Sequence, residues 1–309
     1  MSVLMCPGQG SQRVGMGRDL AERFPAARDT FAAIDDALGI HLSRILWEGP
    51  EEELTLTHYS QPAILAHSAA VWAVVGHRFA DARAAAGHSL GEYSAHVAAG
   101  TLAAPAAARL VRRRGELMYQ AGQQRPGAMA AVLGLPTEQV DEACDAASRP
   151  DGIVVAANLN APDQTVISGD VAAVGRAGDA CKVRGAKRVV PLKVSGAFHS
   201  PLMAPAIDGL HDALTEVPFA DPAFPVLANA SGEPVRTGTD AKRLLVDQLT
   251  APLRWVACMR QAAVLAPGAT FVELGPGNVL SGLAKRILPG ATTVTLGTAA
   301  EVEQFLARA

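Results

Sequence analysis

Short apolar runs alternate along the chain with longer segments in which apolar residues recur every three to four positions. The short runs at residues 3–6, 84–86 and 270–274 predict buried strands, because Gly or Pro bounds them. The longer periodic segments predict helices over residues 19–38, 62–78 (opened by Ser60 as cap and Pro62 in the first turn), 90–99, 105–121, 201–216 and 278–287. Strands that alternate with helices favour an α/β fold built on a parallel sheet.

The pattern changes between residues 127 and 192. Strand and helix signals follow in the order strand 128–133, helix 137–147, strands 153–157 and 165–168, helix 171–183 and strand 188–192. This β-α-β-β-α-β order is typical of a ferredoxin-like unit. We therefore expect a large α/β domain in two parts, residues 1–126 and 193–309, with a ferredoxin-like subdomain, residues 127–192, inserted between them.

Composition narrows the class of protein. Of 309 residues, 49% are apolar and only 5% aromatic, which favours helices packed on parallel strands over an aromatic-rich β sandwich. A net charge of −3 and the lack of a basic stripe with interleaved aromatic residues argue against a nucleic-acid partner. The four cysteines, Cys6, Cys144, Cys181 and Cys258, form no C-x-x-C pair and suit a reducing compartment.

No segment predicts targeting or membrane insertion. The first residues lack a basic region and a long apolar stretch, so they do not resemble a signal peptide. The longest uncharged run, residues 93–109, contains His96, Gly100 and Pro105 and would cross a membrane poorly. These features predict a cytoplasmic protein with no membrane partner.

The most informative motif is Gly87-His88-Ser89-Leu90-Gly91, a G-x-S-x-G pentapeptide. It follows a predicted strand and opens a predicted helix, which is the setting of a nucleophile elbow. Glycines on either side of the serine allow backbone segments to approach closely. In a chain rich in Gly and Ala the pentapeptide could also arise by chance, so Ser89 needs partners to count as a nucleophile.

Two glycine-rich loops also follow predicted strands. The first, residues 8–17, fails the dinucleotide pattern, because Arg13 stands where the third glycine belongs. It is either a flexible loop or a βα loop at the carboxyl edge of the sheet, where α/β sites lie. The second, Gly275-Pro276-Gly277, is either a tight turn or an anion cradle at a helix N-terminus.

Arg114 lies on the apolar face of its predicted helix. The positions that share this face are Leu110, Leu117, Met118 and Ala121. A guanidinium that faces a core is costly unless it is paired. Arg114 therefore either forms a structural salt bridge or binds a substrate carboxylate, for which its planar fork is suited.

A serine nucleophile requires a base. His199 lies on a glycine-containing loop just before a predicted helix, a position like that of Ser89, although a lone histidine is often only a surface or satisfied residue. In ordinary α/β-hydrolases the catalytic histidine lies near the C-terminus, but here the last histidine is His211. A Ser89–His199 pair oriented by an amide or backbone group would work without an aspartate.

Six motifs occur in a characteristic order: Pro7-Gly8-Gln9-Gly10-Ser11-Gln12, Gly87-His88-Ser89-Leu90-Gly91-Glu92, Arg114-Gly115, Ala197-Phe198-His199-Ser200, Gln248 before Pro252, and Gly275-Pro276-Gly277. Together they resemble the malonyl-CoA:acyl-carrier-protein transacylases of fatty acid synthesis, including the stand-alone acyltransferases that serve polyketide synthases. The resemblance spans nearly the whole chain. It implies an α/β-hydrolase-like core with an inserted ferredoxin-like subdomain.

The resemblance also implies roles for single residues. Ser89 would be acylated, and His199 would act as base and then as acid. Gln9 and Leu90 would supply oxyanion-hole N–H groups, Arg114 would hold the malonyl carboxylate, and Gln248 would help to fix His199. The implied reaction is ping-pong, with malonyl-CoA as donor, a carrier-protein thiol as acceptor, and no metal or redox cofactor.

Two positions bear on the acyl group. Malonyl-selective relatives commonly have Phe before the catalytic histidine, as Phe198 is here, whereas methylmalonyl-selective relatives commonly have Ser. The latter often have Gln after the nucleophile, where this chain has Leu90. Both positions favour malonyl, although Gly196 departs from the His that often precedes this part of the motif.

The resemblance implies an acidic acyl carrier protein as partner. Basic residues that could form its docking surface, or could simply be solvated charges, are Lys182, Arg184, Lys187, Arg188, Lys285 and Arg286. Two other functions stay open at this point. One is a serine hydrolase or thioesterase, which the elbow allows, and the other is a non-catalytic module that docks a carrier protein.

Overall fold

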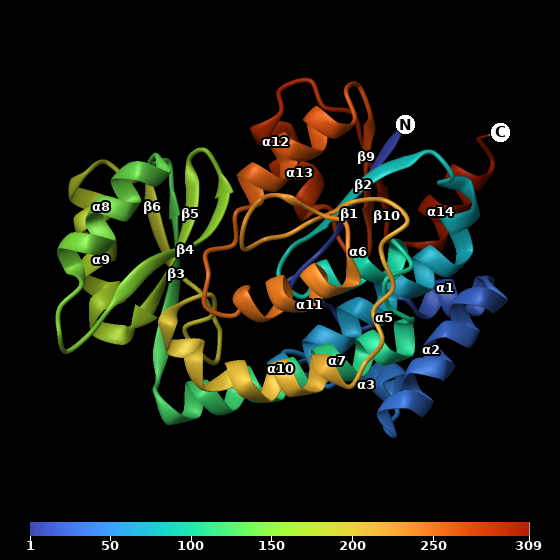
Figure 1. Ribbon diagram of the computed structural model, residues 1–309, viewed down its shortest axis with the longest axis horizontal. Coiled ribbons are helices and arrows are strands. Elements are labelled where there is room, and N and C mark those ends of the chain that lie inside the picture. Colours follow the sequence, from blue (N-terminus) through green and yellow to red (C-terminus); the bar gives the residue numbers. More distant parts are fainter. Residues whose placement is uncertain (309) are drawn as a thin grey trace.

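The computed structural model describes residues 1–308 and centres on a six-stranded sheet (Figure 1). The strand order is β10-β9-β1-β2-β7-β8. All neighbours from β10 to β7 are parallel, and only β8 runs antiparallel to its neighbour. The strands are β1 (Ser2–Cys6), β2 (Ala82–Gly87), β7 (Val226–Leu227), β8 (Pro234–Val235), β9 (Thr270–Leu274) and β10 (Thr293–Leu296).

The helices of the large part lie on both faces of this sheet or pack on the helices that do. They are α1 (Arg18–Arg23), α2 (Pro25–Leu38), α3 (Leu42–Glu48), α4 (Glu51–Leu54), α5 (Thr57–Val75), α6 (Gly91–Ala98), α7 (Ala104–Gln124), α10 (Ile207–Thr215), α11 (Gly238–Asp247), α12 (Trp255–Leu265), α13 (Val279–Ile287) and α14 (Ala299–Leu306). None of the helices within residues 1–308 combines the length and the apolar character needed to cross a bilayer.

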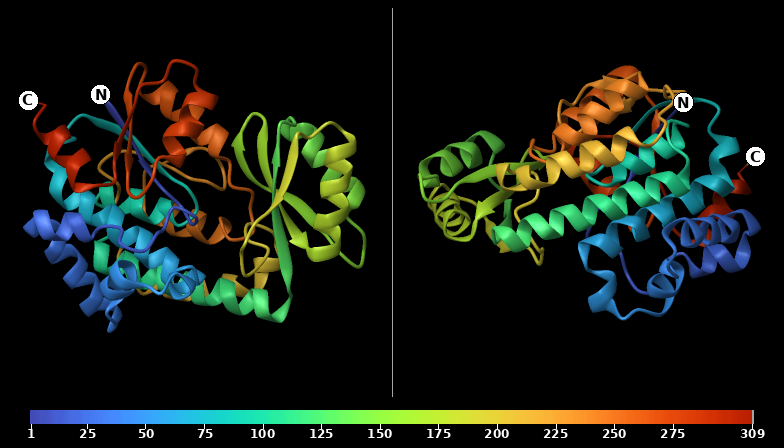
Figure 2. Two further views of the ribbon diagram at one scale, coloured as in Figure 1. Left: turned by 180° about the vertical axis from the view of Figure 1, so that it is seen from behind. Right: turned by 60° about the horizontal axis from the view of Figure 1, so that its bottom comes forward.

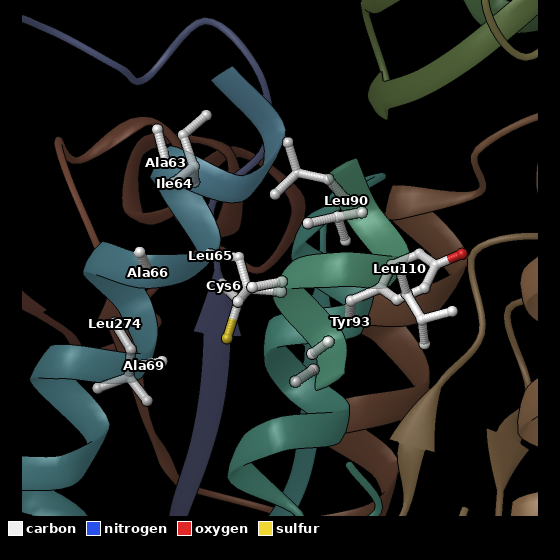
Figure 3. Close-up of a cluster of buried hydrophobic side chains, with 14 of the residues drawn as sticks. Cys6, Ala63, Ile64, Leu65, Ala66, Ala69, Leu90, Tyr93, Leu110 and Leu274 are labelled. Atoms are coloured by element: carbon white, nitrogen blue, oxygen red, sulfur yellow. The ribbon is translucent and has the colours of Figure 1, made fainter. Parts of the chain in front are cut away.

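Alternation along β1 divides the core into two layers. Leu4 and Cys6 pack with α5, α6 and α7, whereas Val3 and Met5 pack with α12 and α13. Figure 3 shows Cys6 between the buried side chains of α5 and α6. Full burial of a side chain such as Ile64 contributes about 1.5–3 kcal/mol relative to its exposure. The nucleophile elbow lies between β2 and α6, so buried side chains from both layers of the core pack around the elements that position it.

The second sheet is antiparallel, with strand order β4-β5-β3-β6. Figure 1 shows it beside the large sheet, with α8 and α9 on its outer face. Its elements are β3 (Gly127–Leu133), α8 (Thr137–Ala147), β4 (Val154–Ala161), β5 (Gln164–Asp170), α9 (Val171–Val183) and β6 (Arg188–Pro191). The predicted fold class, a parallel-sheet α/β core with a βαββαβ insertion, is confirmed.

Helix α7 joins the two parts, since it runs from the large sheet to the start of β3 (Figure 2). Further links cross between them. The backbone of Leu253 pairs with β4, and Arg286 of α13 bonds to Asp163 in the β4–β5 turn. These contacts fix the small sheet as one wall of the cleft described below.

Three predicted helices differ in detail. The segment 19–38 is broken at Phe24, which is extended because Pro25 follows it and disfavours a helical conformation. The helix predicted to open at Ser60 begins at Thr57 with Leu56 as N-cap, so Ser60 is not the cap, and its last turn, Gly76–Arg78, is a 3₁₀ turn. The segment 201–216 begins as a 3₁₀ turn, Pro201–Ala206, because Pro205 lacks an N–H for an α-helical bond.

Candidate active site

Ser89 stands at the turn between β2 and α6 in a left-handed conformation, with φ of 55°. A Cβ on Gly87 would lie 1.8 Å from the carbonyl oxygen of Gly91. A Cβ on Gly91 would lie 2.2 Å from the carbonyl oxygen of Cys6. The two glycines of the motif are therefore required for the backbone to pass this close, and the turn is a nucleophile elbow.

His199 lies directly against the serine. Its Nε2 is 2.8 Å from Ser89 Oγ, and its Nδ1 is 2.9 Å from the backbone carbonyl oxygen of Gln248. A carbonyl only accepts, so Nδ1 carries the proton and Nε2 is free to take one from Ser89. Burial, followed by the nearby Arg114 charge, lowers the pKa of His199 to about 3.

Glycine also positions the loop that carries His199. A Cβ on Gly122 of α7 would lie 2.3 Å from the carbonyl oxygen of Ser195, so this glycine lets the loop rest on the helix. Gly196, which departs from the malonyl pattern, is also tight: a Cβ there would lie 3.3 Å from the ring of Phe198. The absence of a side chain at position 196 leaves Phe198 its place in the cleft.

Arg114 is 1% exposed and points at the nucleophile. Its Nη2 donates to Ser89 Oγ at 3.1 Å and to Gln248 Oε1 at 2.8 Å, and its Nη1 donates to Gln61 Oε1 at 2.7 Å. Within residues 1–308 its guanidinium forms no ion pair with a carboxylate, and Nε has no partner. The structural salt bridge that the sequence allowed is thus not formed, although the buried Glu92 carboxyl is near enough to act on the charge of Arg114.

The two residues predicted to form an oxyanion hole flank the elbow, and Gln9 lines the same cleft as Ser89. Leu90 follows Ser89, and Gln9 follows Gly8, where a Cβ would lie 2.5 Å from the carbonyl oxygen of His88. Within the described part of the chain neither Gln9 nor Leu90 donates its backbone N–H to another group. The side chain of Gln9 is held by Thr57 Oγ1 at 3.0 Å. Both N–H groups are therefore available to a ligand.

A cleft of about 680 Å³ opens over these residues, between the large sheet and the small subdomain. Its lining brings together Gln9, Ser89, Arg114, Phe198 and His199. Further lining residues are Gly10, Gln12, Thr55, Leu56, Thr57, His88, Met118, Met129, Asn158, Leu192, Lys193, Val194 and Ser195. This volume suits a small acyl group attached to a longer arm.

Sequence reasoning missed three buried polar residues around the site. Asn229 Oδ1 accepts the N–H of Ser89 at 2.8 Å, Gln61 holds Arg114, and Glu92 accepts from Gln248 Nε2 at 2.7 Å. Asn229 follows β7 as Ser89 follows β2, at the carboxyl edge of the sheet, and that position was the available signal. The strand before it is only two residues long, too short for a periodic pattern.

The second glycine loop is a turn. The carboxylate of Glu273 accepts the N–H groups of Leu280 and Ser281 at 3.0 and 2.8 Å, so it already occupies the N-terminus of α13. A Cβ on Gly275 would lie 2.5 Å from Pro7, at the base of the loop that carries Gln9. Gly275 therefore supports the neighbouring loop by close packing.

The basic residues suggested for docking come from both parts of the molecule: Lys182, Arg184, Lys187 and Arg188 belong to the small subdomain, and Lys285 and Arg286 belong to α13 of the large part. Lys187 packs against Gly134, whose N–H bonds to Asp163, and Asp163 in turn binds Arg286. Lys182 is paired with Asp179 at 3.0 Å. No group of three or more His, Cys, Asp or Glu side chains placed to hold a metal ion occurs in residues 1–308.

The fold and the Ser–His pair define an acyl-transfer enzyme, and comparison with known proteins agrees. The acyl transferase domain family matches residues 3–298. The chain is 42% identical to the malonyl CoA-acyl carrier protein transacylase of Bacillus subtilis over 302 residues, 97% of this chain and 95% of the relative.

Solved structures give the same result. An acyl carrier protein S-malonyltransferase from Vibrio cholerae superposes with a TM-score of 0.93 at 40% identity, covering 98% of this chain and 99% of that one. A malonyl-transacylase in complex with its type II PKS acyl carrier protein superposes with a TM-score of 0.95 at 41% identity, covering 100% and 99%. The chain belongs to the malonyl CoA-acyl carrier protein transacylase family.

Proposed function

We propose that this chain transfers malonyl from malonyl-CoA to the phosphopantetheine thiol of an acyl carrier protein, and that Ser89 carries the malonyl group between them. The observation that carries the residue assignment is the buried Arg114, whose Nη2 lies 3.1 Å from Ser89 Oγ. An acyl group on this serine has a cation beside it, and malonyl is an acyl group with its own carboxylate. Arginine suits that carboxylate because its guanidinium can donate two parallel hydrogen bonds.

In the first half-reaction Ser89 Oγ attacks the thioester carbonyl carbon while its proton passes to His199 Nε2. The N–H groups of Gln9 and Leu90 stabilise the oxyanion, each contributing on the order of 3–4 kcal/mol. The C–S bond then breaks, and His199 returns the proton to the sulfur of CoA. The malonyl ester on Ser89 is left with its carboxylate on Arg114.

The second half-reaction runs the same steps with the carrier protein. His199 Nε2 takes the proton of the phosphopantetheine thiol, and the thiolate attacks the ester carbonyl. The C–O bond to Ser89 breaks, and His199 returns the proton to Ser89 Oγ. The carbonyl oxygen of Gln248 holds the histidine ring by Nδ1 throughout, at 2.9 Å. Every step uses side chains and amides of this chain, so we propose that it needs no metal or redox cofactor.

Three further assignments belong to this proposal. We propose the domain division at residues 1–126, 127–192 and 193–309, supported by the antiparallel sheet that spans Gly127–Pro191; Ala309 lies outside the described residues. We propose a cytoplasmic location, supported by four free cysteines. We also propose that the acidic carrier docks on the basic residues around Lys187 and Arg286.

The residues favour transfer over the two other functions. The relatives named malonyl transacylases, one of them solved with an acyl carrier protein, favour transfer over hydrolysis, and the Ser–His pair argues against a non-catalytic docking module. The experiment is intact mass spectrometry after incubation with malonyl-, methylmalonyl- and acetyl-CoA. We expect a stable malonyl adduct, a weaker methylmalonyl adduct and little acetyl. Equal labelling by all three thioesters would overturn the assignment of Arg114.

Phe198 is expected to exclude an α-methyl group. Its ring is 6% exposed and forms part of the cleft wall one residue before the base. Phe198→Ser should therefore raise methylmalonyl loading relative to malonyl by about 10- to 100-fold, the range that one methyl group allows. The measurement is the ratio of kcat/KM for the two CoA thioesters. An unchanged ratio in a folded variant would remove Phe198 from the selectivity of the site.

The pH dependence of loading should reflect the buried base. With its pKa lowered to about 3, His199 stays unprotonated as the pH falls from 7 to 5. A histidine with an ordinary pKa of about 6.5 would instead lose roughly thirtyfold of its free base by pH 5. We expect the NMR signals of the His199 ring to show no titration above pH 5, and kcat/KM to show no acid limb from this residue. A ring that titrates near its ordinary pKa would contradict this.

A further inference from the structure

Glu92 is a fully buried carboxyl group close to the site but one layer away from the acyl group. It lies in the first turn of α6, three residues after Ser89. Its Oε2 accepts from Gln248 Nε2 at 2.7 Å and from the N–H of Asn229 at 2.9 Å, while Oε1 has no hydrogen-bond partner within residues 1–308. The mechanism above makes no use of this group, and glutamate side chains are almost never fully buried unless they are paired.

The two residues that Glu92 binds hold the peptide groups of the nucleophile. Asn229 Oδ1 accepts the N–H of Ser89 at 2.8 Å, and Gln248 Nε2 donates to the carbonyl oxygen of Ser89 at 3.1 Å. Ser89 is left-handed, a conformation that residues with a Cβ adopt only when their surroundings hold them there. Glu92 thus supports both groups that keep the elbow in shape.

Glu92 also helps to set which way the Gln248 amide points. The NH₂ of this amide donates to the Glu92 carboxyl at 2.7 Å and to the Ser89 carbonyl at 3.1 Å, and it lies 3.3 Å from Asn229 Oδ1. Its oxygen faces Arg114 Nη2 at 2.8 Å, a group that only donates. Without an acceptor at position 92 the amide nitrogen loses the shortest of these hydrogen bonds. If the amide turned over, its NH₂ would face Arg114 and displace the guanidinium.

We propose that Glu92 is a positioning residue for malonyl selectivity, whose acceptor oxygen orients the Gln248 amide and thereby aims Arg114 at the acyl group on Ser89. This inference rests on the proposed role of Arg114. What matters is the oxygen, not the negative charge. Burial raises the pKa of Glu92 to about 7, and the protonated form retains a carbonyl oxygen that can accept.

The test compares three variants. Glu92→Leu removes the acceptor, Glu92→Gln keeps one, and Glu273→Leu is the control, because Glu273 is also fully buried and accepts two backbone N–H groups but lies outside the site. The readout is the ratio of kcat/KM for malonyl-CoA to that for acetyl-CoA, with Tm measured for each variant. A purely structural role would lower Tm and both rates without changing the ratio.

We expect Glu92→Leu to lower the malonyl-to-acetyl ratio by about tenfold or more, the value of a hydrogen bond to a charged group. Glu92→Gln should restore the ratio, and Glu273→Leu should leave it unchanged. An unchanged ratio in Glu92→Leu, or a loss in Glu92→Gln as large as in Glu92→Leu, would overturn the proposal.

If Glu92→Leu does not fold, Glu92→Asp serves instead. It keeps the carboxyl but withdraws it by one methylene from Gln248, so the ratio should again fall, and an unchanged ratio would overturn the proposal. Failure of the proposed function would be distinguishable from failure of this proposal, because the wild-type protein itself would then show no preference for malonyl-CoA over acetyl-CoA.

Discussion

Ser89→Ala should abolish the covalent malonyl-enzyme and lower turnover by a factor on the order of 10⁴ to 10⁶, the loss seen when a nucleophile is removed from a comparable site. The reason is chemical, since the structure places His199 Nε2 and Arg114 Nη2 on this one oxygen. Without it, nothing at the elbow can form the ester. The measurements are intact mass spectrometry after mixing with malonyl-CoA, and steady-state transfer to the carrier.

The control for this prediction is the melting temperature of the variant, which shows whether Ser89→Ala still folds. Alanine keeps a Cβ and removes only the hydroxyl, so Asn229 and Gln248 still hold the peptide groups at position 89. We therefore expect a Tm near that of the wild-type protein. Malonyl labelling that persists in Ser89→Ala would show that another residue is the nucleophile.

Arg114→Ala should lower malonyl loading on the order of 10²-fold more than acetyl loading. The malonyl carboxylate loses its hydrogen-bond donor in this variant, whereas an acetyl group has no carboxylate. The change also leaves the oxygens of Gln61 and Gln248 without their donor, so both rates should fall somewhat. The difference between the two acyl groups isolates the contact with the carboxylate. It is measured as kcat/KM for each CoA thioester.

Arg113→Ala is the matched control. It removes the same side chain one position along α7, where the arginine side chain is 47% exposed and lies 3.8 Å from Glu116. An exposed pair of this kind contributes little, so we expect neither rate to change. If Arg114→Ala lowered malonyl and acetyl loading equally, Arg114 would hold the site together without binding the carboxylate.

The sequence was sufficient for the overall fold because its patterns are long and regular. The switch at residue 127 predicted the insertion, and the apolar positions around Arg114 placed that side chain inside. The predicted course of two helices was wrong where a single proline decides it. Phe24, just before Pro25, interrupts one helix, and a 3₁₀ turn that contains Pro205 opens the other. Short elements such as β7 and β8 were not predicted, since two residues carry no period.

The parts of the site that depend on the identity of side chains could be predicted from the sequence. The parts that depend on backbone groups could not. The elbow motif and the position of His199 suggested the pair, and the structure places the two atoms 2.8 Å apart. The orientation of the histidine comes from a main-chain carbonyl of Gln248, which no side-chain pattern reveals. The clamp on Ser89 by Asn229 depends on strands that meet only in the folded sheet.

The positions of these groups in the sheet also explain why the catalytic residues follow a different order along this sequence than in ordinary α/β-hydrolases. Ser89, Gln9 and Asn229 follow neighbouring strands β2, β1 and β7, so they share the carboxyl edge of the parallel sheet. His199 reaches them from a loop that packs on α7 just after the inserted subdomain. The base therefore comes before the last strands of the sheet in sequence, and not after them.

The central claim is that Ser89 carries malonyl between two thiols, and the most direct test follows the isolated acyl-enzyme. Wild-type protein is loaded with malonyl-CoA, freed of CoA, and mixed with a phosphopantetheinylated acyl carrier protein while both proteins are followed by mass spectrometry. We predict that the malonyl group leaves Ser89 and appears on the carrier thiol faster than malonate appears in solution. Release of malonate at the same rate with and without the carrier would contradict the account and identify a hydrolase.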